Sequence, residues 1–241
     1  MPKLEVPRIE TSFSRRGSGE RTPTFFTIKD KLIREETQKL AQSIFLMGGT
    51  DSPRVVTFAG IEEGAGCTWL CAHIADILAS QGVGSACLVD ANMHKPSMGN
   101  LFGVSSGQGL SDALLGGGPI REFAKPIMGE KLWLLSSGSF ASDSAESAGV
   151  LNSETMKVRV MELRKEFDYV LIDAAPMSTN AEGVLLGQLA DGLVLVLEAN
   201  STRREAAVRV TETLRTSNVR VLGAVLNKRT FPIPQFVYGL L

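Results

Sequence analysis

Short apolar runs alternate with amphipathic stretches over most of this chain. Six runs rich in Val, Ile and Leu, each bounded by polar or turn-forming residues, predict strands at residues 54–60, 85–91, 131–138, 168–176, 191–200 and 219–228. Around them, apolar residues recur at helical spacing and predict helices at residues 30–47, 68–82, 109–117, 155–167, 182–190 and 202–218. The stretch 68–82, for example, carries Leu70, Ile74 and Leu78 on one side and stops at Gly82.

This alternation predicts the fold class. Strands separated by helices form parallel sheets with helices packed on both faces. We therefore expect an α/β protein with a doubly wound, mostly parallel sheet. The 241 residues suit one such domain at 28–230, preceded by a polar, flexible lead at 1–27 and followed by an apolar tail at 231–241.

Composition narrows the classes of partner. The formal net charge is −1, so no nucleic-acid partner is expected. No apolar run approaches the ~20 residues of a membrane span, and the N-terminus lacks the apolar stretch of a secretory signal. The odd count of cysteines, namely Cys67, Cys71 and Cys87, favours free thiols in a reducing cytoplasm.

A glycine-rich segment joins the first strand to the helix at 68–82. Gly64 and Gly66 allow a phosphate to approach the backbone, the helix N-terminus attracts anions, and Thr68 stands where a hydroxyl would ligand Mg²⁺. These features predict the P-loop NTPase type of fold. The alternative is an ordinary glycine-rich turn between a strand and a helix.

Two aspartates reduce the weight of that alternative. Asp90 ends the second predicted strand and Asp173 ends the fourth, so both carboxylates are expected at the sheet edge that holds the loop. A threonine hydroxyl with strand-end aspartates is the usual arrangement for Mg²⁺ and phosphate.

With these residues in place, the chain resembles the cytoplasmic domain of bacterial tyrosine kinases, the P-loop autokinases that partner polysaccharide co-polymerases in capsule and exopolysaccharide export. The resemblance runs from about residue 33 to residue 227. It is carried by five segments: ACLVDANMHKPSMGNLFGV (86–104), GLSDALLGG (109–117), LSSGSFASDSAES (135–147), FDYVLIDAAP (167–176) and GAVLNK (223–228).

The resemblance implies roles for individual residues. Catalytic positions would be Asp90, Asn92 and Tyr238; nucleotide-binding positions would be Gly64, Ala65, Gly66, Cys67, Thr68 and Asn227, the last reading the adenine; Mg²⁺ ligands would be Thr68, Asp90 and Asp173. It also implies ATP or ADP with Mg²⁺ as ligand, a membrane co-polymerase or kinase paralogue as partner, and recruitment of a cytoplasmic domain to the inner face of the membrane. A homo-oligomer is a further implied state.

The chain departs from the family pattern at several of these positions. Cys67 replaces the loop lysine, Asn92 replaces the second acidic residue after the second strand, and His94 replaces an arginine. The family's oligomerisation motif loses both arginines, which would fall on Gln38 and Ala41. Where the family carries a cluster of tyrosines, the apolar tail holds only Tyr238.

These departures predict that phosphoryl transfer is very slow or absent. A neutral thiol is a weak donor and carries no charge, and beside a helix N-terminus we expect Cys67 to tend toward thiolate, which repels phosphate. Weak binding of nucleotide stays open, as does its loss. We interpret Cys71 as a core residue and expect no metal at the Cys67–Cys71 pair. A redox-sensitive thiol is a further interpretation of Cys67. We interpret His94 as a surface residue.

Three functions are compatible with these residues. The first is a regulatory pseudokinase that binds a polysaccharide co-polymerase or a catalytic paralogue. The second is an active tyrosine autokinase with an unusual loop and Tyr238 as acceptor. The third is a partition-type localisation ATPase, which would need a loop lysine and, in membrane-binding members, a C-terminal helix that Pro232 and Pro234 disfavour.

Overall fold

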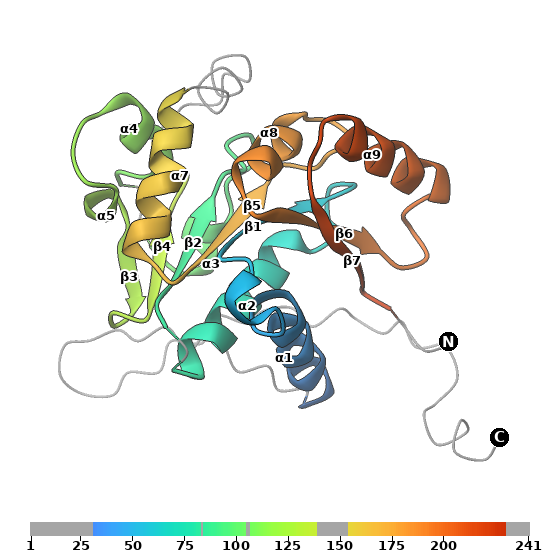
Figure 1. The fold of residues 1–241 in the computed structure, drawn as a ribbon, viewed down its shortest axis with the longest axis horizontal. Coiled ribbons are helices and arrows are strands. Elements are labelled where there is room, and N and C mark those ends of the chain that lie inside the picture. The colour runs from blue at the N-terminus through green and yellow to red at the C-terminus, as the bar shows by residue number, and fades with distance from the viewer. Residues whose placement is uncertain (1–30, 83, 105–106, 139–153, 230–241) are drawn as a thin grey trace.

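A seven-stranded sheet forms the centre of the molecule (Figure 1). The structure, a computed structural model, describes residues 31–82, 84–104, 107–138 and 154–229. The strands are β1 (Val55–Gly60), β2 (Ala86–Asp90), β3 (Lys125–Met128), β4 (Leu132–Leu135), β5 (Tyr169–Ala174), β6 (Gly192–Glu198) and β7 (Val221–Asn227). Their order is β3-β4-β2-β5-β1-β6-β7, and every neighbouring pair is parallel except β3 with β4.

Helices cover both faces of this sheet. They are α1 (Lys31–Phe45), α2 (Cys67–Ser80), α3 (Met98–Leu101), α4 (Leu110–Leu115), α5 (Ile120–Phe123), α7 (Glu154–Glu166), α8 (Glu182–Leu189) and α9 (Arg204–Thr216), with a short 3₁₀ turn at Gly49–Asp51. The predicted doubly wound, mostly parallel fold is therefore confirmed. None of the described helices is both long and apolar enough to cross a membrane.

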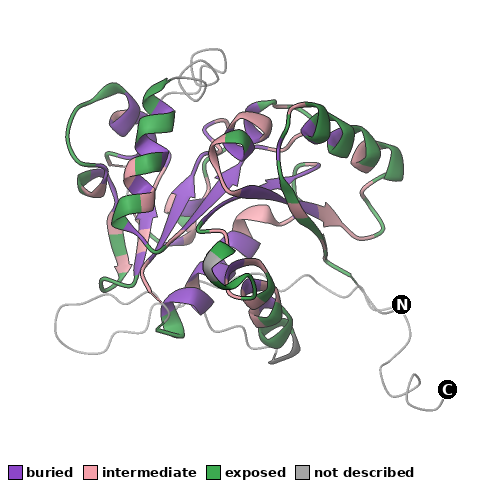
Figure 2. Cartoon of the chain, in the orientation of Figure 1, coloured by how far each residue is buried: buried purple, intermediate pink, exposed green. Residues whose placement is uncertain are grey.

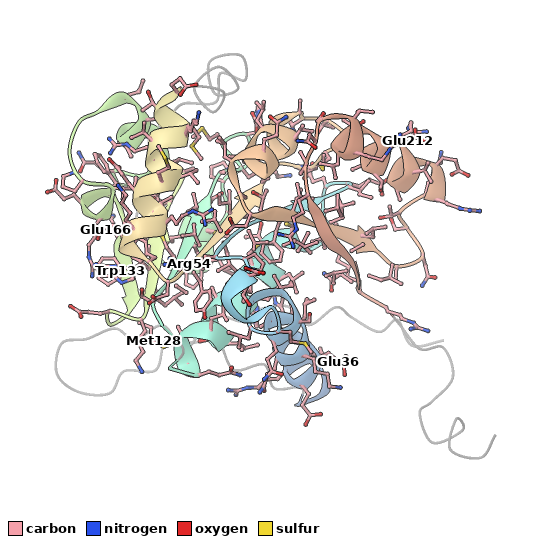
Figure 3. The ribbon with its side chains drawn as sticks, in the orientation of Figure 1. Glu36, Arg54, Met128, Trp133, Glu166 and Glu212 are labelled. Carbon is pink, nitrogen blue, oxygen red and sulfur yellow. The ribbon has the colours of Figure 1, made fainter. Side chains whose placement is uncertain are left out.

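The period-two pattern of the strands builds two separate cores. In β1, Val56 and Phe58 pack in the cluster that contains α1 and α2, whereas Val55 and Ala59 pack in the cluster that contains α7 to α9. All six residues of β1 are buried because both faces are covered. In Figure 2 the strands at the centre are buried and the outer helix faces are exposed. In Figure 3, Glu36 and Glu212 mark such faces on α1 and α9.

The sequence pattern missed β3, α3 and α5. The strand β3 has four residues, includes Pro126 and alternates between half-buried and exposed, so it gives no apolar run. It lies at the edge of the sheet and pairs antiparallel with β4. The helices α3 and α5 have four residues each, which is too short for a helical period to be visible.

Helix α1 contains Ala41, one of the two positions at which the family's oligomerisation motif has an arginine. Ala41, where the family motif would place an arginine, is fully buried. It belongs to the same core cluster as Phe45 of α1 and Cys71 of α2. In this chain that position therefore serves the packing of α1 on the domain. The predicted lead 1–27 and tail 231–241 lie outside the described residues.

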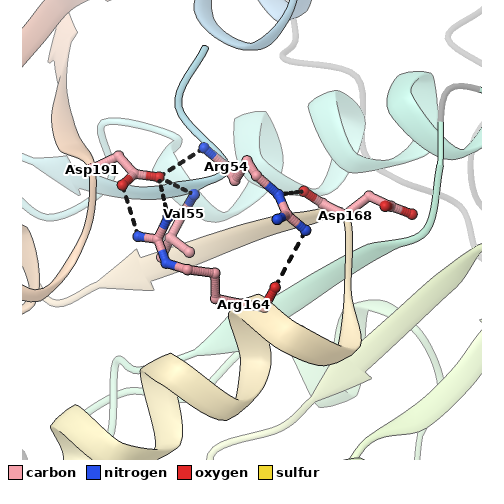
Figure 4. A network of polar contacts seen from close by, with 5 residues as sticks. All are labelled: Arg54, Val55, Arg164, Asp168 and Asp191. Atoms are coloured by element: carbon pink, nitrogen blue, oxygen red, sulfur yellow. Dashed lines mark hydrogen bonds and ion pairs between the residues drawn. The ribbon is translucent and has the colours of Figure 1, made fainter. Parts of the chain in front are cut away.

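A polar network fastens the amino ends of three central strands (Figure 4). Asp191, just before β6, accepts the backbone N–H groups of Arg54 and Val55 at 2.8 and 2.9 Å and pairs with Arg164 of α7 at 2.7 Å. Arg54 in turn donates to the carbonyl of Asp168, just before β5, at 3.0 Å. Burial raises the pKa of Asp191, but the bonds from Arg164, Val55 and Arg54 together outweigh it and leave that pKa lowered. This network lies at the opposite end of the strands from the glycine-rich loop.

Arg159 holds the loop that follows α4 by hydrogen bonds from its side chain. Its side chain is nearly fully buried and donates to the carbonyls of Ala113, Gly116 and Gly118 at 2.8 to 2.9 Å. It also pairs with Glu162 at 2.7 Å. One guanidinium thus satisfies three carbonyls at the end of α4 and beyond it.

We predict that Arg159→Met lowers the free energy of unfolding by about 2–4 kcal/mol, because it leaves these carbonyls without donors. Urea-induced unfolding followed by circular dichroism measures this change. Lys157→Met on the same helix is the matched control, since the Lys157 side chain is 57% exposed and meets only Glu154 at 3.8 Å. Equal losses in the two variants would contradict the assigned role.

Candidate functional site

The predicted phosphate loop connects β1 to α2. Gly64 and Gly66 have φ of 84° and 86°, the left-handed region that favours glycine. Gly66 is also the residue that precedes the first turn of α2, and no side chain caps the helix there. The first-turn amides of α2 therefore remain available to an anion, as the sequence predicted.

Asn227, at the end of β7, lies against this loop. Its Nδ2 donates to the carbonyl of Ala65 at 2.9 Å. A Cβ placed on Gly66 would lie 2.4 Å from the same nitrogen, so the close approach requires glycine. The structure thus gives Asn227 a role in tying the last strand to the loop, and its predicted contact with adenine stays a prediction.

Thr68 and the two aspartates meet at the carboxyl edge of the sheet. Asp90 and Asp173 are register partners in the neighbouring strands β2 and β5, and each is 1% exposed. Thr68 donates to Asp173 Oδ2 at 2.5 Å. Asp90 Oδ2 accepts the backbone N–H groups of Ser97 and Met98 at 3.1 and 3.0 Å, at the start of α3. The three predicted Mg²⁺ ligands are therefore brought together.

Each aspartate keeps one oxygen without a partner. Oδ1 of Asp90 and Oδ1 of Asp173 are both buried and accept no hydrogen bond within the part of the chain that the structure describes. No described lysine or arginine pairs with either carboxylate. Buried acceptors of this kind are costly unless a proton or a cation occupies them. The residues thus fit a divalent cation with oxygen ligands.

Burial raises the pKa values of both aspartates. It raises the pKa of Asp173 to about 7, against the opposing effects of the Thr68 hydroxyl and the nearby Cys67 thiol. It raises the pKa of Asp90 to about 6, against the opposing effect of backbone N–H donors. Perturbed carboxylates at a sheet edge are typical of functional sites.

The prediction of a thiolate at Cys67 is wrong. The Cys67 thiol is half-buried, and its pKa lies well above the usual value because it donates to Cys71, because burial disfavours the charge, and because Asp173 is nearby. Burial likewise raises the pKa of Cys71 to about 11. The position of the loop lysine is therefore occupied by a neutral thiol that faces an acid.

The residues that follow β2 form a polar turn. Asn92 Oδ1 accepts the backbone N–H of Lys95 at 3.2 Å, so this side chain holds the turn where the family has a carboxylate. The Lys95 ammonium pairs with Glu63 at the surface of the phosphate loop. The His94 side chain, which we interpreted as a surface residue, is 24% exposed, and its Nε2 lies 2.7 Å from Oε1 of Glu182.

Sequence reasoning missed the role of Glu182 in this region. Glu182 begins α8, is 2% exposed and leaves Oε2 without a partner among the described residues. Cys71, interpreted from the sequence as a core residue, is fully buried and lies beside Cys67 and Asp173. Tyr238 lies outside the described residues. A hollow of about 270 Å³ beside the turn 177–181 is lined by none of the predicted site residues.

The fold and this edge of the sheet define a P-loop NTPase-type domain. Comparisons with known proteins narrow the class. Residues 54–221 match the family model described as Cellulose biosynthesis protein BcsQ. The chain is 31% identical to the tyrosine-protein kinase YwqD of Bacillus subtilis (strain 168) over 164 residues, which are 68% of each chain. The chain therefore belongs to the bacterial tyrosine autokinase domain family.

Other matches agree with this family. The kinase domain of VpsO superposes with a TM-score of 0.72 at 25% identity, covering 85% of this chain and all of that domain. The succinoglycan biosynthesis transport protein ExoP of Rhizobium meliloti (strain 1021) is 27% identical over 76% of this chain, which spans 23% of that protein. The septum site-determining protein MinD of Pyrococcus horikoshii OT3, solved with Mg-ADP, shares the fold at 19% identity and a TM-score of 0.61, covering 76% of this chain and 75% of its own.

We predict that Asp173→Asn stabilises the protein more at pH 8 than at pH 5. The pKa of Asp173 is about 7 in the folded protein, whereas that of an aspartate in the unfolded chain is ~3.9. The proton bound to Asp173 therefore contributes its full stabilisation below pH ~3.9, and this stabilisation is lost as the pH rises through about 7. Asparagine carries no charge at either pH. Its advantage should reach about 1 kcal/mol or more at pH 8.

Thermal unfolding in metal-free buffer at the two pH values measures this difference. Asp51→Asn, at an exposed aspartate of the 3₁₀ turn, is the control. An equal gain for Asp173→Asn at both pH values would show that Asp173 is not protonated in the folded protein.

Proposed function

We propose that this chain is a kinase-family P-loop domain that has lost phosphoryl transfer and acts as a regulatory partner in exopolysaccharide or capsule assembly. Its partner would be a polysaccharide co-polymerase or a paralogous kinase. Through that partner the domain would work at the cytoplasmic face of the membrane.

The observation that carries this proposal is the neutral thiol of Cys67 at the lysine position. In P-loop enzymes, the lysine there is a point charge on the β- and γ-phosphates, which Cys67 cannot supply. Removing one well-placed donor to developing charge costs about 10²–10³ in rate. The ammonium of Lys95, the basic residue that follows β2, is engaged by Glu63 at the protein surface.

The remaining groups support weak nucleotide binding at most. The open amides of α2 fit a phosphate, and Thr68, Asp90 and Asp173 fit Mg²⁺. Mg²⁺ would bridge and neutralise phosphate oxygens when bound. Thr68 and Asp173 would position the ion, while nothing in the described loop would balance the rest of the phosphate charge.

The partnership rests on the relatives. ExoP is named as a transport protein of succinoglycan biosynthesis, and the matched region is a quarter or less of its length. In that relative a domain of this kind is thus joined to a larger protein. We infer that this domain likewise works with a polysaccharide co-polymerase.

An active autokinase with Tyr238 as acceptor is the second candidate. It is favoured by the intact Thr68–Asp173 contact and by the register of Asp90 beside Asp173. A partition-type localisation ATPase is the third, and the missing loop lysine counts against it.

We predict that Cys67→Lys increases the affinity for Mg·ATP and Mg·ADP at least about 10-fold, because it restores the phosphate contact. Isothermal titration calorimetry on wild type, Cys67→Lys and Cys67→Ser measures this, with the serine variant as the uncharged control. Addition of Asp173→Asn to Cys67→Lys should weaken the Mg²⁺-dependent part of any gain.

Tight binding by wild type together with phosphate on Tyr238 after incubation with Mg·ATP would contradict the proposal. That result would establish the active kinase. If neither wild type nor Cys67→Lys binds nucleotide, the loop is not a nucleotide site in this chain.

A second prediction concerns the role in cells. In a strain that lacks this protein, we expect Thr68→Ala to restore polysaccharide output to the wild-type level, because the proposed role needs no turnover. Output is measured with immunoblots to match protein abundance. A folded, equally abundant Thr68→Ala that restores nothing would favour a catalytic role.

A further inference from the structure

A cluster of soft and acidic ligands lies beside the phosphate loop. Cys67 and Cys71 are one helical turn apart on α2, so their side chains share the face that meets the end of β5. Their Sγ atoms and a carboxylate oxygen of Asp173 all lie within 4.8 Å of one another. The three groups come from two elements that the core holds rigidly, since Cys71 is fully buried and Asp173 is 1% exposed.

An independent feature indicates that this cluster holds a ligand. Asp173 gives Oδ2 to Thr68, but its Oδ1 is buried and has no partner among the described residues. A buried carboxylate oxygen without a donor is an exception in folded proteins and is usually explained by an ion or a proton. Both sulfurs lie within 4.8 Å of a carboxylate oxygen of Asp173, so an ion bound there would find further ligands.

We propose that Cys67, Cys71 and Asp173 bind a thiophilic divalent cation of the Zn²⁺ class. Two sulfurs and one carboxylate oxygen are ligands of the kind that Zn²⁺ accepts, and three protein ligands leave a fourth position for water or another group. Mg²⁺ avoids sulfur and prefers oxygen. The two thiols therefore select for a different ion from the one that Thr68 and the aspartates would hold with nucleotide.

The other candidate ligand on this helix does not take part. The His73 ring stacks on Trp69 at 3.8 Å between centroids, and its Nδ1 lies 2.8 Å from the Trp69 carbonyl. The cluster of possible metal ligands accordingly does not include His73. The sequence prediction of no metal at the Cys67–Cys71 pair counted only those residues and lacked Asp173, which is far away in sequence.

The proposed site would compete with Mg·nucleotide because both require Asp173. On binding, the cation forms bonds to both sulfurs and each thiol releases its proton to solvent. The two thiolates would balance the charge of the ion, so the occupied site would not replace the positive charge of a lysine at residue 67. The domain would then be stabilised by a metal in place of a nucleotide.

Titration of the reduced, metal-free full chain with Cd²⁺ alone tests this inference. Cd²⁺ is a Zn²⁺ analogue whose bonds to thiolates give an ultraviolet charge-transfer band. We expect the band to saturate at one ion per chain in wild type and in Cys87→Ala. Cys87 is the matched control because it is fully buried in β2, where its thiol donates to the Leu88 carbonyl.

The cluster variants give the decisive comparison. Cys71→Ser should weaken Cd²⁺ binding at least about 10-fold, as should Asp173→Asn, each checked for folding by circular dichroism. The absence of a band in wild type, or an unchanged band in both variants, would overturn the proposal.

A second measurement covers the case in which Cys71→Ser does not fold. In wild type, Zn²⁺ should protect Cys67 from alkylation by iodoacetamide, read by mass spectrometry, whereas Mg²⁺ should not. Equal alkylation with and without Zn²⁺ would overturn the proposal. Neither assay contains nucleotide, so its failure would leave the proposed pseudokinase function untouched.

Discussion

Two buried carboxylates on adjacent parallel strands determine the electrostatics of the candidate site. The register of β2 and β5 places Asp90 beside Asp173, and the cores on either side of the sheet exclude water from both. Burial at this place disfavours the charged form of a carboxylate, which is why the pKa values of both rise. In a working P-loop, Mg²⁺ and a lysine balance negative charge at this edge. Here the lysine is gone and the acids remain.

The two buried carboxylates also explain why the Cys67 thiol is neutral. The neutral Cys67 thiol has a single S–H, which it donates to Cys71 beside the Asp173 carboxyl. The helix N-terminus favours a thiolate, but burial and the nearby carboxylate outweigh it. The same position that fails as a phosphate contact is therefore well suited to a soft cation.

The sequence predicted the frame of this structure better than its details. Apolar runs and helical spacing were sufficient for six strands and the doubly wound fold, because these elements are buried and long enough to show a period. The edge strand β3 was invisible because Pro126 and exposed positions interrupt its pattern. The predicted strand ends and the loop before α2 were sufficient to predict that Thr68, Asp90 and Asp173 lie close together. Partners chosen by three-dimensional packing, such as Glu182 for His94 and Asp173 for Cys71, have no signal in local spacing.

The network of Arg54, Arg164 and Asp191 is built at the end of the sheet that carries no site residue. It anchors β1, β5 and β6 through groups that nucleotide chemistry never uses. Replacement of residues in the phosphate loop therefore leaves the main fastening of the strands intact. A protein of this family could therefore lose a catalytic side chain and still fold, so that its binding role is kept after catalysis is lost.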